Sequence, residues 1–226
     1  LDPSEMGAAF AIGYDWMYNE WTKDQRKLME DKMMEYQLNY VKKAYYNSFS
    51  ASWAKGDNNW NAVCNGGALM AAVALYDKYP DMCSDIVEKA LRGVEYMIRY
   101  FYPNGAWYEG TGYWGYAMKY YCMMISTTEA AFGSNFNLMK APGLDKTAEF
   151  IIALDGPTGN YNFHDAAGSG HSNLAELFWL SNEYNNPGVT SARLYAMDKY
   201  NWSAGISNWG ENVVNVLFYD TSIKAQ

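Results

Sequence analysis

The residues best suited to chemistry lie in a short aromatic stretch, NGAWYEGTGYWGYAMKYY, at positions 104–121. It contains five tyrosines and two tryptophans. Tyr113 and Tyr116 are three residues apart and would share one face of a helix, and Tyr120 follows four residues later. A tyrosine, whose pKa is ordinarily about 10, serves as a general acid or base only where its surroundings tune that pKa. The same spacing also suits a packing stripe, so the pattern by itself leaves both interpretations open.

A second candidate stretch, GDNNWNAVCNGG at positions 56–67, is rich in asparagine near the start of a predicted helix. Asn58, Asn59, Asn61 and Asn65 exceed what helix capping needs, and Asn61 and Asn65 would lie on one helical face. Amide donors beside a helix N-terminus suit an anion such as a substrate carboxylate. The alternative is ordinary structure: one N-cap, two loop residues and one buried amide.

Helices must position both clusters, because helical periodicity runs through most of the chain. Thr22 and Gln25 form a capping-box pattern at one helix start, and Pro80 and Pro103 mark the ends of other helices. Strand patterns are nearly absent before residue 213, and the segment 201–219 fits either a strand or a helix end. We expect helices over about 4–20, 22–46, 60–79, 81–102, 112–131, 143–153, 173–184 and 188–200, and a long loop over 155–172.

The short turns between these helices predict an all-α fold of antiparallel helical hairpins. Hairpins of roughly fifty residues that follow one another in a ring or arc make an all-helical layer architecture. The helix ends of such an arrangement surround a central cleft. Both candidate clusters fall at predicted helix starts or in the loops just before them, so we expect them near such a cleft.

Composition narrows the class of ligand. The 226 residues carry a net charge of −8, which argues against nucleic acid and against an anionic membrane surface. No apolar run approaches the roughly 18 residues of a transmembrane helix. Twenty-one tyrosines against nine phenylalanines favour walls that bind sugars, because tyrosine combines apolar area with a hydroxyl. Cys64, Cys83 and Cys122 lack the spacing of a metal site, so we predict buried thiols and no metal.

Four segments together resemble the heparinase II/III-like family of polysaccharide lyases: AIGYDWMYNEW (11–21), NNWNAVCNGGALMAAVAL (58–75), NGAWYEGTGYWGYAMKYY (104–121) and FHD…ELFWLS (163–181). This resemblance implies an (α/α) toroid followed by a β-sandwich domain. Residues 1–212 would form part of the toroid, and residues 213–226 would lead toward a β-sandwich that lies outside this chain. The resemblance also implies a periplasmic or secreted protein.

The activity that this resemblance implies is β-elimination at uronic acid residues, without a cofactor in this chain. An Asn or His neutralises the substrate carboxylate, a Tyr or His takes the C5 proton, and a Tyr protonates the departing O4. The family's spacing between its neutralising residue and its catalytic tyrosine, counted back from Tyr113, reaches Asn58 and Asn59. Counted back from Tyr116 it reaches Asn61, which remains an alternative pair.

Further residues near the two clusters complete the site that the resemblance implies. The substrate-binding set is Asn61, Asn65, Trp60, Trp107, Glu109, Trp114, Lys119 and His164. Where several relatives have His or Arg in the first cluster, this chain has Asn and Val, and the family's other catalytic histidine comes from the β-sandwich side. The chain by itself would therefore be weakly active or inactive. Its acidic charge favours an anionic polysaccharide that carries uronate and little sulfate.

Two other functions fit the same sequence. A glycoside hydrolase of (α/α) toroid type needs two facing carboxylates, for which the candidates are Glu109 with Asp57 or Asp165. A non-catalytic helical domain would bind glycans through its aromatic wall, and Tyr113→Phe would then leave binding unchanged. Elimination leaves a double bond in the product and hydrolysis does not, so product chemistry separates the two enzymes.

Overall fold

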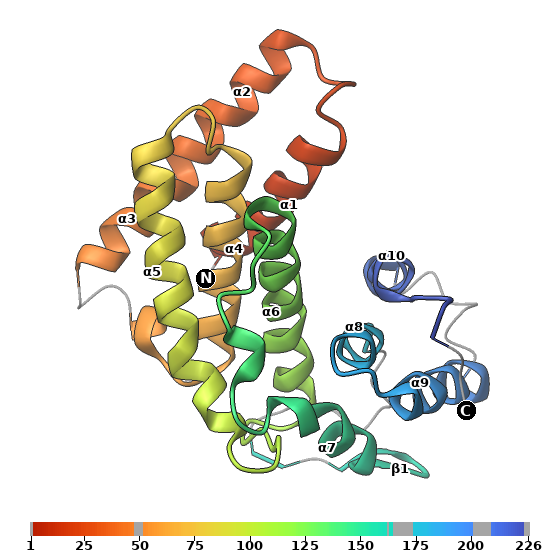
Figure 1. Ribbon diagram of the computed structural model, residues 1–226. Coiled ribbons are helices and arrows are strands. Elements are labelled where there is room, and N and C mark those ends of the chain that lie inside the picture. The colour runs from red at the N-terminus through yellow and green to blue at the C-terminus, as the bar shows by residue number, and fades with distance from the viewer. Residues whose placement is uncertain (1, 48–51, 162, 165–173, 201–208, 224–226) are drawn as a thin grey trace. The chain divides into compact units, whose positions relative to one another are not determined.

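The computed structural model describes residues 2–47, 52–161, 163–164, 174–200 and 209–223, with side chains described from residue 214 onward in the last range. Within these ranges the chain is mostly helical, which confirms the predicted all-α class (Figure 1). The chain divides into two compact units, one made of residues 1–98 and 123–138, the other of residues 99–122 and 139–226. The long helix α6 (Thr111–Phe132) contributes its first half to the second unit and its last half to the first.

The first unit is built almost entirely from helices that follow one another through short turns (Figure 1). Its helix starts agree with the sequence signals: Thr22 caps α2, and the Thr22 backbone N–H donates in return to Gln25 Oε1 over 2.9 Å, which confirms the capping box. A π turn joins α2 to α3 without a break in the helical run. The elements are α1 (Asp2–Trp16), α2 (Lys23–Met33), a π turn (Met34–Leu38), α3 (Asn39–Tyr46), a 3-10 turn (Ser52–Lys55), α4 (Asn59–Ala74) and α5 (Pro80–Ile98).

The core of the first unit depends on a very close crossing of α1 over α4. Ser4, Ala8 and Ala11 are the buried, small side chains of α1, and α4 presents Gly67 to them. A Cβ atom at Gly67 would overlap the backbone carbonyl of Ser4, so only glycine permits this approach. Cys64 and Cys83 are buried in the same core, as the sequence predicted.

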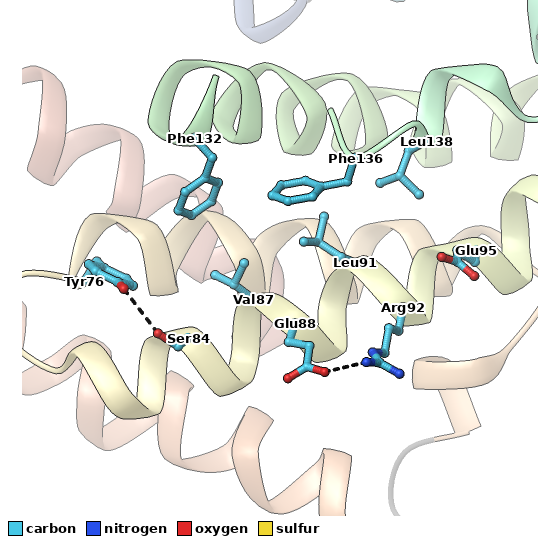
Figure 2. Close-up of a pocket in the computed structure, with 10 residues that line it drawn as sticks. All are labelled: Tyr76, Ser84, Val87, Glu88, Leu91, Arg92, Glu95, Phe132, Phe136 and Leu138. Atoms are coloured by element: carbon cyan, nitrogen blue, oxygen red, sulfur yellow. Dashed lines mark hydrogen bonds and ion pairs between the residues drawn. The ribbon is translucent and has the colours of Figure 1, made fainter. Parts of the chain in front are cut away.

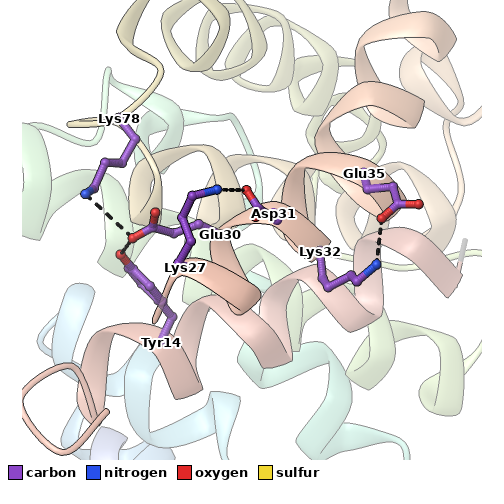
Figure 3. A network of polar contacts seen from close by, with 7 residues as sticks. All are labelled: Tyr14, Lys27, Glu30, Asp31, Lys32, Glu35 and Lys78. Atoms are coloured by element: carbon purple, nitrogen blue, oxygen red, sulfur yellow. Dashed lines mark hydrogen bonds and ion pairs between the residues drawn. The ribbon is translucent and has the colours of Figure 1, made fainter. Parts of the chain in front are cut away.

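A buried hydrogen bond between Tyr14 and Glu30 connects α1 to α2 (Figure 3). The Tyr14 hydroxyl donates a hydrogen bond of 2.7 Å to Glu30 Oε1, and the Lys78 ammonium lies 3.7 Å from the same oxygen. Burial, and then the hydrogen bond to Glu30, raise the pKa of the Tyr14 phenol well above its ordinary value. Glu30 is itself buried, and the Tyr14 hydroxyl gives it a hydrogen bond while the Lys78 ammonium gives it an opposite charge.

The second unit consists of shorter helices and one small hairpin. Its buried rings include Phe101, Trp107, Trp114 and Tyr121, and Cys122 is also buried. The elements, besides the first half of α6, are a 3-10 turn (Arg99–Phe101), a second 3-10 turn (Leu138–Lys140) whose first residue belongs to the first unit, a third 3-10 turn (Leu144–Lys146), α7 (Thr147–Ala153), β1 (Asp155–Gly156), β2 (Gly159–Asn160), α8 (Glu176–Glu183), α9 (Pro187–Lys199) and α10 (Trp209–Phe218).

Two sequence expectations need correction, and the structure decides one alternative that the sequence left open. The expected loop that begins at residue 155 opens with an antiparallel hairpin in which Asp155 faces Asn160, and two-residue strands are too short to show an alternating pattern. The helix expected over 60–79 ends at Ala74, because a turn closed by the Lys78 and Tyr79 amides on the Leu75 carbonyl precedes Pro80. The ambiguous segment 201–219 contains a helix, α10, in its described part.

No helix in the described ranges has both the length and the apolar character needed to cross a membrane.

Candidate functional site

The asparagine cluster lies at the first turns of α4, in the first unit. Asn58 is the N-cap residue, with extended backbone angles of φ −103° and ψ −179°, but its side chain makes no capping hydrogen bond. Its Oδ1 atom is buried and receives no hydrogen bond from any residue that the structure describes. Asn59 is the first residue of the helix and is buried, whereas the neighbouring Trp60 is 47% exposed. Asn58 is thus a half-buried amide that its own helix does not use.

Asn61 and Asn65 are fully buried and serve the packing of α4. Asn61 Nδ2 donates to the backbone carbonyls of Trp53 and Gly93, each over 3.0 Å. Asn65 Nδ2 donates to the Asn61 carbonyl over 2.9 Å, and the Tyr45 hydroxyl donates to Asn65 Oδ1 over 2.7 Å. Two of the four asparagines therefore tie α4 to the 3-10 turn Ser52–Lys55, to α5 and to α3.

The tyrosine cluster lies at the start of α6, in the second unit. Tyr113 and Tyr116 are both half-buried, and the Tyr116 and Tyr120 rings meet edge to face with centroids 5.7 Å apart. Lys119 is half-buried on the same helix, and Glu109 is buried just before the helix begins. The expected helical row of tyrosines is therefore present, and its members are accessible only in part.

The two tryptophans of this stretch belong to the packed interior. Trp114 Nε1 donates to Thr147 Oγ1 over 2.7 Å, and that hydroxyl donates to the Gly105 carbonyl over 2.8 Å. Trp107 is fully buried and packs on Phe101, with ring centroids 5.2 Å apart. A sugar could stack on either indole only if the second unit opened. Trp114 holds the start of α6 against α7 through Thr147, and Trp107 fills the interior beside Phe101.

His164, which the family resemblance placed in the substrate-binding set, lies beside the tyrosine stretch through a contact with Tyr108 that no spacing predicts. Its ring meets the ring of Tyr108 edge to face at 5.7 Å, and Tyr108 in turn contacts Tyr100 at 5.6 Å. All three side chains are exposed. Sequence reasoning missed Tyr100 and undervalued Tyr108, because their meeting depends on the loop that precedes α6 and not on helical spacing. His171 and Asp165 lie outside the described residues.

The structure thus brings Asn58, Asn59 and Trp60 together in the first unit, and Tyr113, Tyr116, Lys119 and His164 within the second. The pairing of Tyr113 with Asn58 or Asn59, which joins residues of different units, remains a prediction. Among the described residues, no group of three histidine, cysteine, aspartate or glutamate side chains is arranged to hold a metal ion.

A separate cavity of about 390 Å³ lies in the first unit, between α5 and residues 132–138 (Figure 2). Its floor is apolar, with Phe132, Phe136 and Leu138 facing Val87 and Leu91 across it (Figure 2). Polar groups form its edge: the Arg92 guanidinium donates to Glu88 over 2.7 Å, and the Ser84 hydroxyl donates to the Tyr76 hydroxyl over 3.3 Å. None of the residues predicted for the site lines this cavity, and its apolar floor does not suit a charged sugar.

A scan of the chain against models of protein families finds no match, and a search of curated proteins finds no significant relative.

Proposed function

We propose that this chain is the helical part of a polysaccharide lyase, which cleaves uronic-acid-containing polysaccharide by β-elimination. The observation that carries the proposal is the position of the two segments most specific to the heparinase II/III-like resemblance. Each has its polar residues at a helix start: Asn58 caps α4 without using its side chain, and Tyr113 lies in the first turn of α6. Amides and phenols at such positions are suited to bind an anion and to move a proton.

The chemistry assigns one task to each cluster. The proton on C5 of a uronate is barely acidic while the neighbouring carboxylate is charged, so the site must first neutralise that carboxylate. Asn58 and Asn59, beside the positive end of α4, would do so by donating hydrogen bonds. A base then takes the C5 proton, a double bond forms between C4 and C5, and the C4–O4 bond breaks with its electron pair on O4. Tyr113 would protonate O4, with Tyr116 as the alternative.

The exposure of each remaining candidate side chain indicates whether it can contact the polysaccharide. Trp60, Tyr116, Lys119 and His164 are accessible and are proposed to contact the polysaccharide. Asn61 and Asn65 have their amide donors engaged inside the first unit, whereas the half-buried Asn58 side chain is not used for capping, which favours Asn58 as the neutralising residue. Glu109 is buried beside Gly110 at the start of α6 and is proposed to shape the site.

The larger architecture is part of the same proposal. Residues 1–212 would form part of an (α/α) toroid, and residues 213–226 would lead to a β-sandwich of the same protein, which supplies a further catalytic base. A periplasmic or secreted location follows from the same family resemblance.

The test uses the full-length protein that the gene encodes. Wild type, Tyr113→Phe and Tyr120→Phe are incubated with a panel of uronate polysaccharides while the ultraviolet absorbance of unsaturated uronate is recorded. We expect the rate with Tyr113→Phe to fall by about 100-fold to 10,000-fold, the usual share of one acid or base. Tyr120→Phe, which removes a hydroxyl from the same helix, should keep most of the activity. Equal rates for all three proteins would exclude Tyr113 from the chemistry.

A non-catalytic glycan-binding role is the second candidate, favoured by the exposed rings of Tyr100, Tyr108 and His164. Rings that contact one another at the surface offer a stacking platform that requires no proton transfer. This role predicts polysaccharide binding without unsaturated products in wild type. New reducing ends without ultraviolet absorbance would instead indicate a hydrolase that uses Glu109.

A further inference from the structure

A second surface with chemistry of its own lies on the outer side of the run formed by α2, the π turn and α3. The inner side of this run packs on the rest of the first unit. Its buried residues include Glu30, Met33, Leu38 and Val41. The outer side carries two tyrosines that are more than half exposed, Tyr36 at 55% and Tyr40 at 57%. Large aromatic side chains left in water on a helix that has a complete buried face call for an explanation.

Each exposed ring is accompanied by a lysine. The Lys32 ammonium lies 5.0 Å from the centre of the Tyr36 ring, and the Lys43 ammonium lies 5.9 Å from the centre of the Tyr40 ring. These distances are typical of cation–π contacts. Lys32, Tyr36, Tyr40 and Lys43 are named here the tyrosine–lysine face.

The π turn helps to align this face. Each hydrogen bond of a π turn spans five residues instead of four. Residues four apart therefore lie more nearly in line along the axis than they do in an α-helix, where they wind around it. Lys32, Tyr36 and Tyr40 are spaced by four, and the turn Met34–Leu38 falls between the first and the last of them. Single π turns within α-helices occur frequently at functional sites.

The charge of this surface is opposite to that of the whole chain. From Tyr36 to Tyr46 the sequence has two lysines, Lys42 and Lys43, and no acidic residue, whereas the chain carries a net charge of −8. Glu35 is the acidic neighbour, and it forms an exposed ion pair of 2.8 Å with Lys32 (Figure 3). Exposed pairs of this kind contribute little, so a carboxylate of a ligand can compete for Lys32.

We propose that the tyrosine–lysine face is a second binding surface for anionic polysaccharide, separate from the residues assigned to catalysis. The choice of ligand rests on the proposed function. Tyrosine rings stack on the apolar faces of sugar rings, and lysine ammonium groups pair with uronate carboxylates that recur along the chain. Two neighbouring rings with a lysine at either end, spread along the outside of one helical run, match an extended polymer and not a compact ligand.

The test compares two double variants that remove the same chemistry from different helices. Lys32→Ala with Tyr36→Ala removes one ring of the face together with its lysine. The matched control is Tyr195→Ala with Lys199→Ala, because Tyr195 on α9 is 65% exposed and the Lys199 ammonium lies 5.4 Å from its ring centre. Both doubles also carry Tyr113→Phe, so that polymer is not consumed. Titration calorimetry then measures affinity for polygalacturonate and alginate, with dextran as the uncharged polymer, at low and high NaCl.

We expect the face variant to bind both uronate polymers about tenfold more weakly than its Tyr113→Phe parent, and the control variant to bind as the parent does. Binding of the parent should weaken at high salt, and dextran should not bind. Equal affinity of face variant and parent, or no binding by the parent, would overturn the proposal. So would a change in oligomeric state in the face variant, which would make the surface a protein contact. Elimination by wild type is scored separately, so failure of the lyase assignment is distinguishable from failure of this surface.

Discussion

At the scale of single residues, the asparagine cluster separates into two kinds of side chain. Asn61 and Asn65 face inward and satisfy backbone carbonyls of neighbouring elements, whereas Asn58 stands at the helix start with its side chain unused for capping. Sequence spacing identified the cluster and the shared face of Asn61 and Asn65. It could not tell that this face is the buried one, because spacing fixes which residues lie together and not which way they point.

The two kinds predict opposite effects of substitution to alanine. Asn61→Ala leaves the Trp53 and Gly93 carbonyls without that donor, so the free energy of unfolding should fall by about 1–3 kcal/mol. Asn58→Ala removes no capping bond and should change the free energy of unfolding by less than about 0.5 kcal/mol, while lowering lyase activity. Urea denaturation and the ultraviolet assay measure the two quantities. A stable, fully active Asn58→Ala protein would remove Asn58 from the site.

Sequence spacing also failed to show that the two tryptophans of the aromatic stretch point into the core. Trp107 and Trp114 stand in the stretch with the most aromatic rings, and that composition suited a sugar-binding wall. Their burial depends on contacts with Phe101 and Thr147, and Thr147 is 33 residues from Trp114 in sequence. No local pattern contains such a contact. The meeting of Tyr108 with His164 was missed for the same reason.

At the scale of elements, the sequence predicted helix starts better than helix ends. Thr22 with Gln25 placed the start of α2 correctly, and the helix expected from residue 81 begins at Pro80, but the end expected just before Pro80 falls at Ala74. The π turn after α2 and the hairpin of β1 and β2 were not foreseen. A π turn keeps the apolar pattern of a helix, and a hairpin with two-residue strands has no pattern to detect.

The close crossing of α1 and α4 gives a sharp prediction at this scale. Gly67→Ala places a methyl group against the Ser4 carbonyl, so the free energy of unfolding should fall by about 1–3 kcal/mol, as overpacking usually costs. Gly13→Ala in α1 is the matched control, because nothing lies within 4 Å of its new methyl group. That change should stabilise the protein by roughly 0.5–1 kcal/mol through helix propensity. Thermal denaturation of both variants tests the crossing, and a neutral Gly67→Ala would contradict it.

At the scale of the whole molecule, buried phenols make stability depend on alkaline pH. Burial raises the pKa of Tyr14, Tyr45, Tyr121 and Tyr184 above the ordinary value. The folded state therefore holds these protons to a higher pH than the unfolded state does. Their contribution is complete below about pH 10, the unfolded pKa, and is lost as pH rises above it.

We therefore expect the free energy of unfolding to fall with increasing steepness above about pH 10. Tyr14→Phe, which removes one titrating group, should make that fall less steep, although it also removes the hydrogen bond to Glu30. Urea denaturation at a series of alkaline pH values measures the slope in both proteins. An identical slope in wild type and variant would mean that the Tyr14 phenol titrates normally in the folded state.

The most direct test of the central claim is the mass of the products formed from a uronate oligosaccharide by the protein with all of its encoded chain. Elimination predicts that the fragment with the new non-reducing end is lighter by one water molecule than its hydrolytic counterpart, because a C4–C5 double bond replaces the elements of water. Only this mass, formed by wild type and nearly lost in Tyr113→Phe, agrees with a lyase that uses Tyr113. Fragments with the full hydrolytic mass would contradict the account and identify a hydrolase.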